Sequence, residues 1–149
     1  MSFPEYVDQQ AAVVVRLSTR IAAPVERVWA LHTGIGAWPD WNPGIDSACL
    51  TGPLSPGAEF RWQTAGMTID STVYAVEAPH RILWGGPAHG ITGIHSWTFT
   101  TDGDATVVHT EESWDGDPVR ADPENLRHAL EESLRAWLEA LRTTAETAA

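Results

Sequence analysis

Two histidines and a glutamate stand close together in the second half of the chain. His95 lies in one strand-like run, and His109 and Glu111 lie in the next, residues 105–112. An imidazole oriented by a carboxylate can accept and return protons near neutral pH, which suits acid–base chemistry on a carbonyl compound. The same residue types also fit two different roles. Either they satisfy one another and ordered water in a buried site, or two histidines and a carboxylate hold a non-haem iron.

Alternation determines which of these side chains share a face, because successive residues of a strand point to opposite sides. In residues 94–100 the bulky set of His95, Trp97 and Phe99 is favoured as the interior face. The next run offers two faces, and alternation alone does not choose between them: Val107, His109 and Glu111, or Thr106, Val108, Thr110 and Glu112.

The segments that position these residues begin with a half-buried strand over residues 13–21, where β-branched residues alternate with polar ones. A helix is predicted from Pro24, since proline suits a first turn. Gly34 and Gly36 end that helix, and a second, very short helix precedes Trp38. The apolar spacing within the first helix comes from Val25, Val28, Trp29 and His32.

Glycine and proline divide residues 45–113 into short runs, which predicts six strands joined mostly by hairpins. The last segment, from Pro123 to about residue 144, has the apolar stripe of an amphipathic helix. Because no repeat, linker or low-complexity block interrupts this order, the sequence predicts one domain over residues 12–145 after an N-terminal tail of residues 1–11.

Composition narrows the classes of function. Nine arginines and no lysine against 20 acidic residues give a net charge of −11, which disfavours binding to the anionic backbone of nucleic acid. Without lysine, side-chain imine chemistry is excluded. No apolar run is long enough to span a membrane, and no secretory signal is visible, so we expect a cytoplasmic protein with no membrane association.

The order of elements and three local motifs resemble those of the START-like (SRPBCC, polyketide cyclase/dehydrase-like) superfamily. The motifs are Ile-Ala-Ala-Pro-Val-Glu-Arg-Val-Trp at 21–29, Trp-Pro-Asp-Trp-Asn-Pro at 38–43, and Gly-Pro-Leu-Ser-Pro-Gly-Ala-Glu-Phe at 52–60. The resemblance implies an α+β helix-grip fold, in which a seven-stranded antiparallel sheet curves around a long C-terminal helix. Two short helices would lie between strands 1 and 2, and a half-apolar cavity would lie between sheet and helix.

The resemblance also favours the face of His109 and Glu111 as the inward one, because a Val-x-His-x-Glu run after an Asp-Gly turn is similar to the corresponding strand of many relatives. This choice requires a three-residue loop, residues 102–104, which would pair His95 with Glu111 and Trp97 with His109. We therefore predict His95, His109 and Glu111 as catalytic residues, with no metal and no cofactor.

Most of the remaining cavity wall is predicted to be aromatic or aliphatic, and its tryptophans either stack on a planar ligand or fill the core. Asn42 would lie at the cavity mouth, where it either binds the ligand or holds a turn. The predicted ligand-binding residues are Trp41, Asn42, Phe60, Trp62, Ile69, Ser71, Val73, Trp84, Trp97, Phe99, Leu130, Leu134 and Trp137.

Three hypotheses for function follow. The chain binds a small hydrophobic molecule, aromatic or polyketide-like, and catalyses cofactor-free cyclisation, dehydration or isomerisation through the histidines and Glu111. Alternatively it is a non-catalytic carrier that sequesters a hydrophobic metabolite, or an interaction module of the co-chaperone kind. The expected partner in the first two cases is a small hydrophobic ligand, and the protein itself would be a monomer or homodimer.

Overall fold

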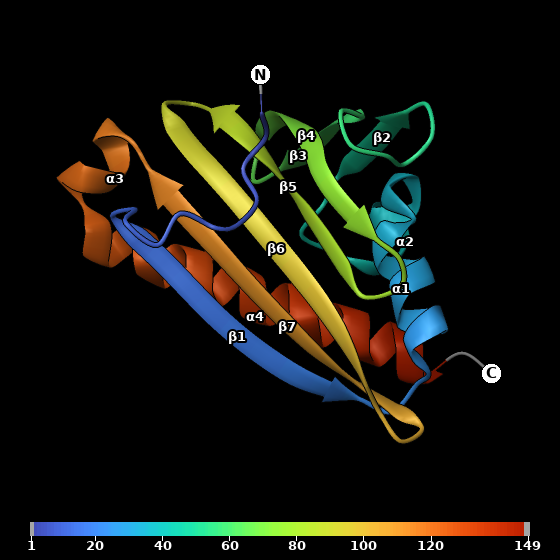
Figure 1. The fold of residues 1–149 in the computed structure, drawn as a ribbon. Helices are drawn as coiled ribbons and strands as arrows, with labels where there is room; N and C mark the ends of the chain where they lie inside the picture. Colours follow the sequence, from blue (N-terminus) through green and yellow to red (C-terminus); the bar gives the residue numbers. More distant parts are fainter. Residues whose placement is uncertain (1, 148–149) are drawn as a thin grey trace.

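Seven antiparallel strands form one open, curved sheet in the computed structural model, which describes residues 2–147 (Figure 1). Their order across the sheet is β1-β7-β6-β5-β4-β3-β2, so every consecutive pair from β2 to β7 is a hairpin neighbour and β1 lies beside β7. The strands are β1 (Val13–Ile21), β2 (Ser47–Thr51), β3 (Glu59–Thr64), β4 (Met67–Glu77), β5 (Arg81–Ala88), β6 (Ile91–Asp102) and β7 (Ala105–Asp115). This confirms the six strands predicted after the first helices.

The helices confirm the helix-grip arrangement. Between β1 and β2 lie α1 (Val25–Thr33), the 3-10 turn η1 (Ile35–Ala37) and the one-turn α2 (Trp38–Trp41). The long helix α4 (Pro123–Thr147) lies along the concave side of the sheet (Figure 1). A short helix that was not predicted, α3 (Asp117–Ala121), joins β7 to α4. Its Arg120 pairs with Asp115 and Asp117 at the surface of this turn.

The buried side of α4 meets two separate groups of side chains. Near the start of the helix, Leu130 and Leu134 pack in what we call the aliphatic cluster, with Val13, Val15 and Val119. Further along, Trp137 packs against aromatic rings from the sheet and from the first helices. The helix therefore joins two halves of the interior that differ in chemistry.

The hairpin between β6 and β7 differs from its predicted register by one residue. Asp102 pairs with Ala105, so the loop contains only Gly103 and Asp104. Gly103 has a φ of 62°, and glycine at the first of two loop positions suits the II′ turn common in hairpins. The prediction of a three-residue loop over residues 102–104 is therefore wrong. Because side chains alternate with a period of two, this single step exchanges the two faces of β7.

As a result, His109 and Glu111 lie on the convex, outer face of the sheet rather than in the interior. Glu111 contacts Arg16 of β1 at 2.6 Å, and His109 Nδ1 is hydrogen-bonded to Ser18 Oγ at 3.0 Å. The predicted pairs of His95 with Glu111 and of Trp97 with His109 are wrong. Glu112 lies opposite His95, and Thr110 lies opposite Trp97.

The N-terminal tail, residues 2–11, crosses the outer face of the sheet instead of extending away from it (Figure 1). The Asp8 amide donates to Ser113 Oγ at 3.1 Å, and the Phe3 ring lies 5.3 Å from that of Tyr74. Val7 of the tail is buried, and Leu83 of β5, on the outer side of the sheet, is fully buried. The tail is thus a cover for part of the outer face.

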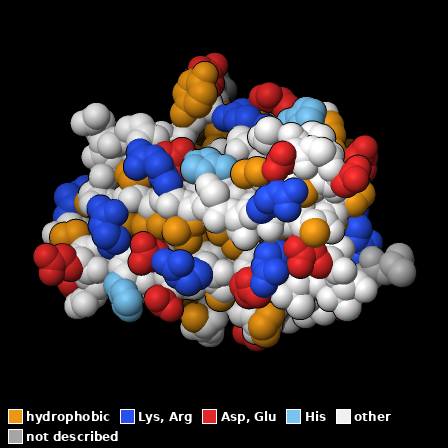
Figure 2. Space-filling view, turned by 90° about the horizontal axis from the view of Figure 1, so that it is seen from below, with side chains coloured by type: hydrophobic (Ala, Val, Ile, Leu, Met, Phe, Trp, Pro, Cys, Tyr) orange, Lys and Arg blue, Asp and Glu red, His pale blue; other side chains and the backbone are white. Residues whose placement is uncertain are grey.

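Charged side chains of both signs are interspersed over the lower side of the molecule (Figure 2). Several arginines on α3 and α4 pair with acidic neighbours on the same helix, as Arg142 does with Glu139 and Glu146. Exposed pairs of this kind contribute little to stability. Within residues 2–147, no helix has the length and apolar character needed to cross a bilayer.

Candidate functional site

Nine aromatic or imidazole rings fill the space between the sheet and the second half of α4. We call them the aromatic cluster: His32, Trp38, Phe60, Trp62, Trp84, His95, Trp97, Phe99 and Trp137. Their centroids lie 4.1–6.1 Å from their neighbours, the spacing at which rings attract in tilted or edge-to-face pairs. The region predicted to be a cavity is therefore occupied by side chains.

The pleat of the sheet explains why so many rings meet here. His95, Trp97 and Phe99 alternate along β6 and all face inward, as predicted. Trp84 of β5 lies opposite His95, with its ring centroid 4.7 Å from the imidazole. Phe60 and Trp62 come from β3 in the same way. The helices complete the enclosure with one ring each from α1, α2 and α4.

The predicted ligand-binding residues divide into three groups. Ser71 and Val73 are buried together with the predicted rings of the cluster, and Trp41 and Ile69 pack against its edge. Leu130 and Leu134 instead lie in the aliphatic cluster. Asn42 has the turn role, because its side-chain oxygen accepts a hydrogen bond from the Gly44 amide at 3.0 Å. Ligand contact by any of these residues stays a prediction.

One polar group, His95, is fixed in its tautomer by the neighbouring strand. Thr110 donates its hydroxyl proton to the Ser96 carbonyl at 3.1 Å, which leaves its oxygen free to accept. His95 Nε2 lies 2.8 Å from that oxygen and therefore carries the donated proton. Burial, followed by the nearby His32, lowers the pKa of His95 well below its usual value, so the ring is neutral. Its Nδ1 then presents a lone pair.

That lone pair faces Glu112, whose Oε1 lies 3.1 Å from His95 Nδ1. The other carboxyl oxygen accepts a hydrogen bond from Trp114 Nε1 at 2.8 Å. Burial raises the pKa of Glu112 to about 8, and the Trp114 hydrogen bond offsets only part of this effect. At neutral pH Glu112 is accordingly a carboxylic acid whose proton can be shared with His95. The two side chains form a buried, uncharged His–Glu pair.

His32 is the second buried imidazole of the cluster. It projects from α1 into the interior, is fully buried, and lies 4.1 Å from the Trp97 ring. Burial lowers the pKa of His32 to about 3, so this ring is also neutral. Trp38 donates its indole proton to the backbone carbonyl of His32 at 2.8 Å, which ties α2 to α1.

Several buried polar atoms of the cluster have no hydrogen-bond partner among the described residues. They are the indole Nε1 atoms of Trp84, Trp97 and Trp137, both ring nitrogens of His32, and Nδ1 of His95, which lies near Glu112 without forming a hydrogen bond to it. Trp41 at the edge of the cluster adds a fourth indole. Buried donors and acceptors in folded proteins are nearly always paired with protein groups, ligands or ordered water. A group of such atoms in one place therefore marks this part of the interior as a candidate binding site.

Three polar residues of this site, Glu112, Thr110 and His32, were not predicted from the sequence as site residues. Glu112 and Thr110 belonged to the alternative face of β7, which alternation had left open and the family resemblance disfavoured. His32 had the helical spacing of a buried residue, but its hydrogen-bonding state follows from packing and gives no sequence signal. His109 lies on the outer face of the sheet, so its side chain cannot contact His95 on the inner face. Within residues 2–147 no cluster of three or more metal-ligating side chains is assembled.

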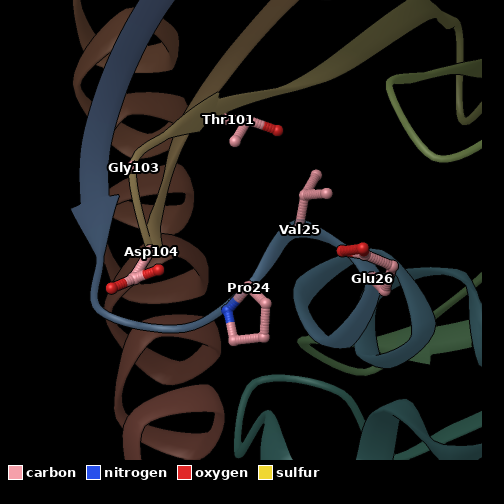
Figure 3. Close-up of a pocket in the computed structure, with 6 residues that line it drawn as sticks. All are labelled: Pro24, Val25, Glu26, Thr101, Gly103 and Asp104. Atoms are coloured by element: carbon pink, nitrogen blue, oxygen red, sulfur yellow. The ribbon is translucent and has the colours of Figure 1, made fainter.

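A separate, shallow pocket of about 390 Å³ lies at the C-terminal end of β6, between the β6–β7 hairpin and the start of α1 (Figure 3). Its lining includes none of the aromatic cluster, so it does not correspond to the predicted interior cavity. The lining residues are Pro24, Val25, Glu26, Thr101, Gly103 and Asp104.

Comparison with known proteins gives one family and many similar folds. The model of the family described as "Polyketide cyclase / dehydrase and lipid transport" matches residues 12–146. Among curated proteins, a search finds no significant match.

Three solved structures illustrate the kinds of protein whose fold is similar to that of this chain. A hypothetical protein from Helicobacter pylori, jhp0584, has a TM-score of 0.81 at 17% identity, covering 97% of this chain and 99% of its own. A START superfamily protein from Mycobacterium smegmatis has a TM-score of 0.79 at 17% identity, covering 89% and 97%. The Zhui aromatase/cyclase from Streptomyces sp. R1128 has a TM-score of 0.78 at 19% identity, covering 89% and 93%. At these identities the likeness shows the fold alone.

Proposed function

Because this chain belongs to the polyketide cyclase/dehydrase and lipid-transport family, we propose that it binds a small, flat, largely apolar molecule between the sheet and α4. The observation that carries the proposal is the aromatic cluster with its unpartnered indole N–H groups. A ligand that stacks among these rings and presents oxygen acceptors would satisfy donors that the protein leaves unsatisfied.

The chemistry of the cluster favours rings with carbonyl groups over a plain acyl chain. Large rings attract other rings in specific tilted geometries, whereas an alkyl chain gains only from burial. Trp84, Trp97 and Trp137 each offer one buried donor, and a carbonyl oxygen can accept from more than one of them. The rings already fill the space, so binding requires some of them to rotate away from their neighbours and restack on the ligand.

Binding can be tested on the intact protein in two ways. Native mass spectrometry of freshly purified protein should detect a co-purified ligand, and 9-fluorenone, a planar ketone, should quench the tryptophan fluorescence saturably at a 1:1 ratio. The matched control is Tyr6→Ala, which removes an exposed aromatic residue of the tail and should leave binding unchanged. Only non-saturable quenching, equal to that of free N-acetyltryptophanamide, together with no co-purified ligand, would contradict the proposal.

A second candidate, catalysis of proton transfer, is favoured by the His95–Glu112 pair. The pair is uncharged and holds one mobile proton on Glu112 and one lone pair on His95 Nδ1. It can therefore donate a proton to a carbonyl oxygen and accept one from the adjacent carbon without leaving a net charge in the interior. Positioned acid–base groups of this kind typically contribute about 10²–10⁴-fold in rate.

Exchange of the α-protons of 2-tetralone in D₂O, followed by NMR, measures this activity without knowledge of the natural substrate. We expect the wild type to accelerate exchange above the buffer rate. Glu112→Gln should reduce this acceleration by a factor of at least about 10². Glu111→Gln is the matched control one residue away on the outer face and should retain it. If the wild type binds 2-tetralone but does not accelerate exchange, the protein is a carrier and the catalytic candidate falls.

A further inference from the structure

The buried histidine of α1, His32, has no part in the His95–Glu112 pair. It follows Val25 and Val28 on the buried side of its helix, which delivers its ring to the centre of the aromatic cluster. The ring is 0% exposed and has aromatic neighbours from three other elements: Trp97 of β6 at 4.1 Å, Trp38 of α2 at 5.9 Å and Trp137 of α4 at 6.1 Å between centroids.

Both ring nitrogens of His32 are buried without a hydrogen-bond partner. A neutral imidazole always has one N–H donor and one lone-pair acceptor, so His32 leaves one of each unsatisfied. A position that served only to fill the core would be better occupied by an apolar residue of similar size, because an unpaired polar group in the interior destabilises the fold.

The lone pair of His32 differs from the other orphaned atoms in what it can bind. Trp84, Trp97 and Trp137 offer donors only, since an indole has no acceptor nitrogen. His95 Nδ1, the other imidazole lone pair, faces the Glu112 carboxyl. Of the two unpartnered imidazole lone pairs in the described part of the cluster, His32 is therefore the one that has no carboxyl group beside it and can accept from a ligand donor.

We propose that His32 is a ligand-binding residue that accepts a hydrogen bond from a hydroxyl group on the ligand. The inference rests on the proposed function, in which a planar ketone stacks in the same place, and it narrows the ligand class to hydroxylated ring ketones. The ketone oxygen accepts from indole N–H groups, and the hydroxyl donates to His32. Sites that hydrogen-bond a ligand hydroxyl discriminate strongly against the analogue that lacks it.

The test compares two probes that differ by one hydroxyl group, 9-fluorenone and 2-hydroxy-9-fluorenone, by isothermal titration calorimetry on the full chain. The wild type should bind the hydroxylated probe about tenfold more tightly. His32→Phe, which keeps a ring but has no acceptor, should bind both probes with equal affinity. His32→Gln keeps an acceptor and should retain a preference for the hydroxylated probe.

Two further variants control for structure. His109→Phe makes the same change on the outer face and should retain the wild-type preference. His32→Leu removes the acceptor with a different shape, so the comparison stands even if the phenylalanine variant does not fold. Circular dichroism and thermal melting establish which variants are folded before titration.

The outcomes separate the inference from its premise. If the wild type binds neither fluorenone, the role of His32 falls, and the proposed function falls with it when no ligand co-purifies with the protein. If it binds both probes equally, or if His32→Phe or His32→Leu keeps the preference, the role of His32 is overturned while the proposed binding of planar ketones stands.

Discussion

Glu111 and Glu112 are adjacent, chemically identical and almost equally shielded, with side chains 19% and 15% exposed. They nevertheless face opposite sides of β7. Glu111 lies 2.6 Å from the guanidinium of Arg16, whereas Glu112 has a neutral imidazole and an indole N–H as its neighbours. The contrast teaches that two adjacent carboxyl groups of similar exposure can have opposite surroundings, and that burial away from any arginine raises the pKa of Glu112.

The same contrast extends along the whole β6–β7 hairpin. The inner face of β7 carries Thr106, Val108 and Thr110, all fully buried, while the outer face is partly exposed and in contact with β1 and the tail. A one-residue difference in loop length separates these two arrangements. Variants placed at neighbouring positions therefore test the register directly.

The largest effect is expected when the same charge is placed first on the inner face of β7 and then on the outer face. Val108 is fully buried, so Val108→Asp should lower the free energy of unfolding by at least about 4 kcal/mol. Val107 is paired with Arg20 across the β1–β7 ladder, and Val107→Asp should change it by less than about 1 kcal/mol. Urea unfolding followed by circular dichroism measures both. The reverse order would restore the register predicted from the sequence.

A smaller effect follows from the protonation of Glu112. Its pKa is about 8 in the folded protein and 4.5 ordinarily, so between these values the folded state holds a proton that the unfolded chain has lost. Stability from this group is present at low pH and is lost as the pH rises toward 8. His32 and His95 have lowered pKa values and act in the opposite direction, but only below about pH 6.5.

Comparison of the wild type with Glu112→Gln isolates Glu112, because both proteins contain the same histidines. From pH 6.5 to 8 the Glu112 proton should lower the free energy of unfolding of the wild type by about 2 kcal/mol relative to the variant. Glu112→Gln should remove that slope, and Glu111→Gln should preserve it. Urea unfolding curves at several pH values provide the measurement, and an unchanged slope in Glu112→Gln would assign the proton to another group.

The smallest effect concerns the hydroxyl groups that contact the two histidines. Thr110→Val removes the acceptor of the His95 N–H and the donor to the Ser96 carbonyl, which should cost about 1–2 kcal/mol. Ser18→Ala removes the hydroxyl beside His109 on the outer face, where the cost should stay within about 0.5 kcal/mol. Equal costs, measured by thermal unfolding, would mean that the two histidines have similar surroundings.

Much of the fold is predictable from the sequence because its signals are local. Pro24 at the start of a helical spacing, glycine and proline between the later strands, and the apolar stripe after Pro123 each describe one element and its ends. The inward face of His95, Trp97 and Phe99 is equally local, since bulky apolar side chains favour the buried side of a strand.

The site is less predictable because it depends on relations between elements. The identity of the carboxyl beside His95 rests on the length of one turn, and both two-residue and three-residue loops suit the sequence Asp-Gly-Asp at residues 102–104. The position of Leu130 and Leu134 in a cluster apart from Trp137 depends on how α4 crosses the sheet. The stripe on the helix contains no information about that crossing.

The central claim is that a protonated Glu112 faces a neutral His95 in the interior, and a ¹³C NMR titration of the glutamate side-chain carboxyls tests it most directly. Glu112→Gln assigns the resonance by its disappearance. We predict that the Glu112 carboxyl titrates with a midpoint near 8. A midpoint close to the ordinary value of 4.5 would contradict the claim, because Glu112 would then be ionised at neutral pH.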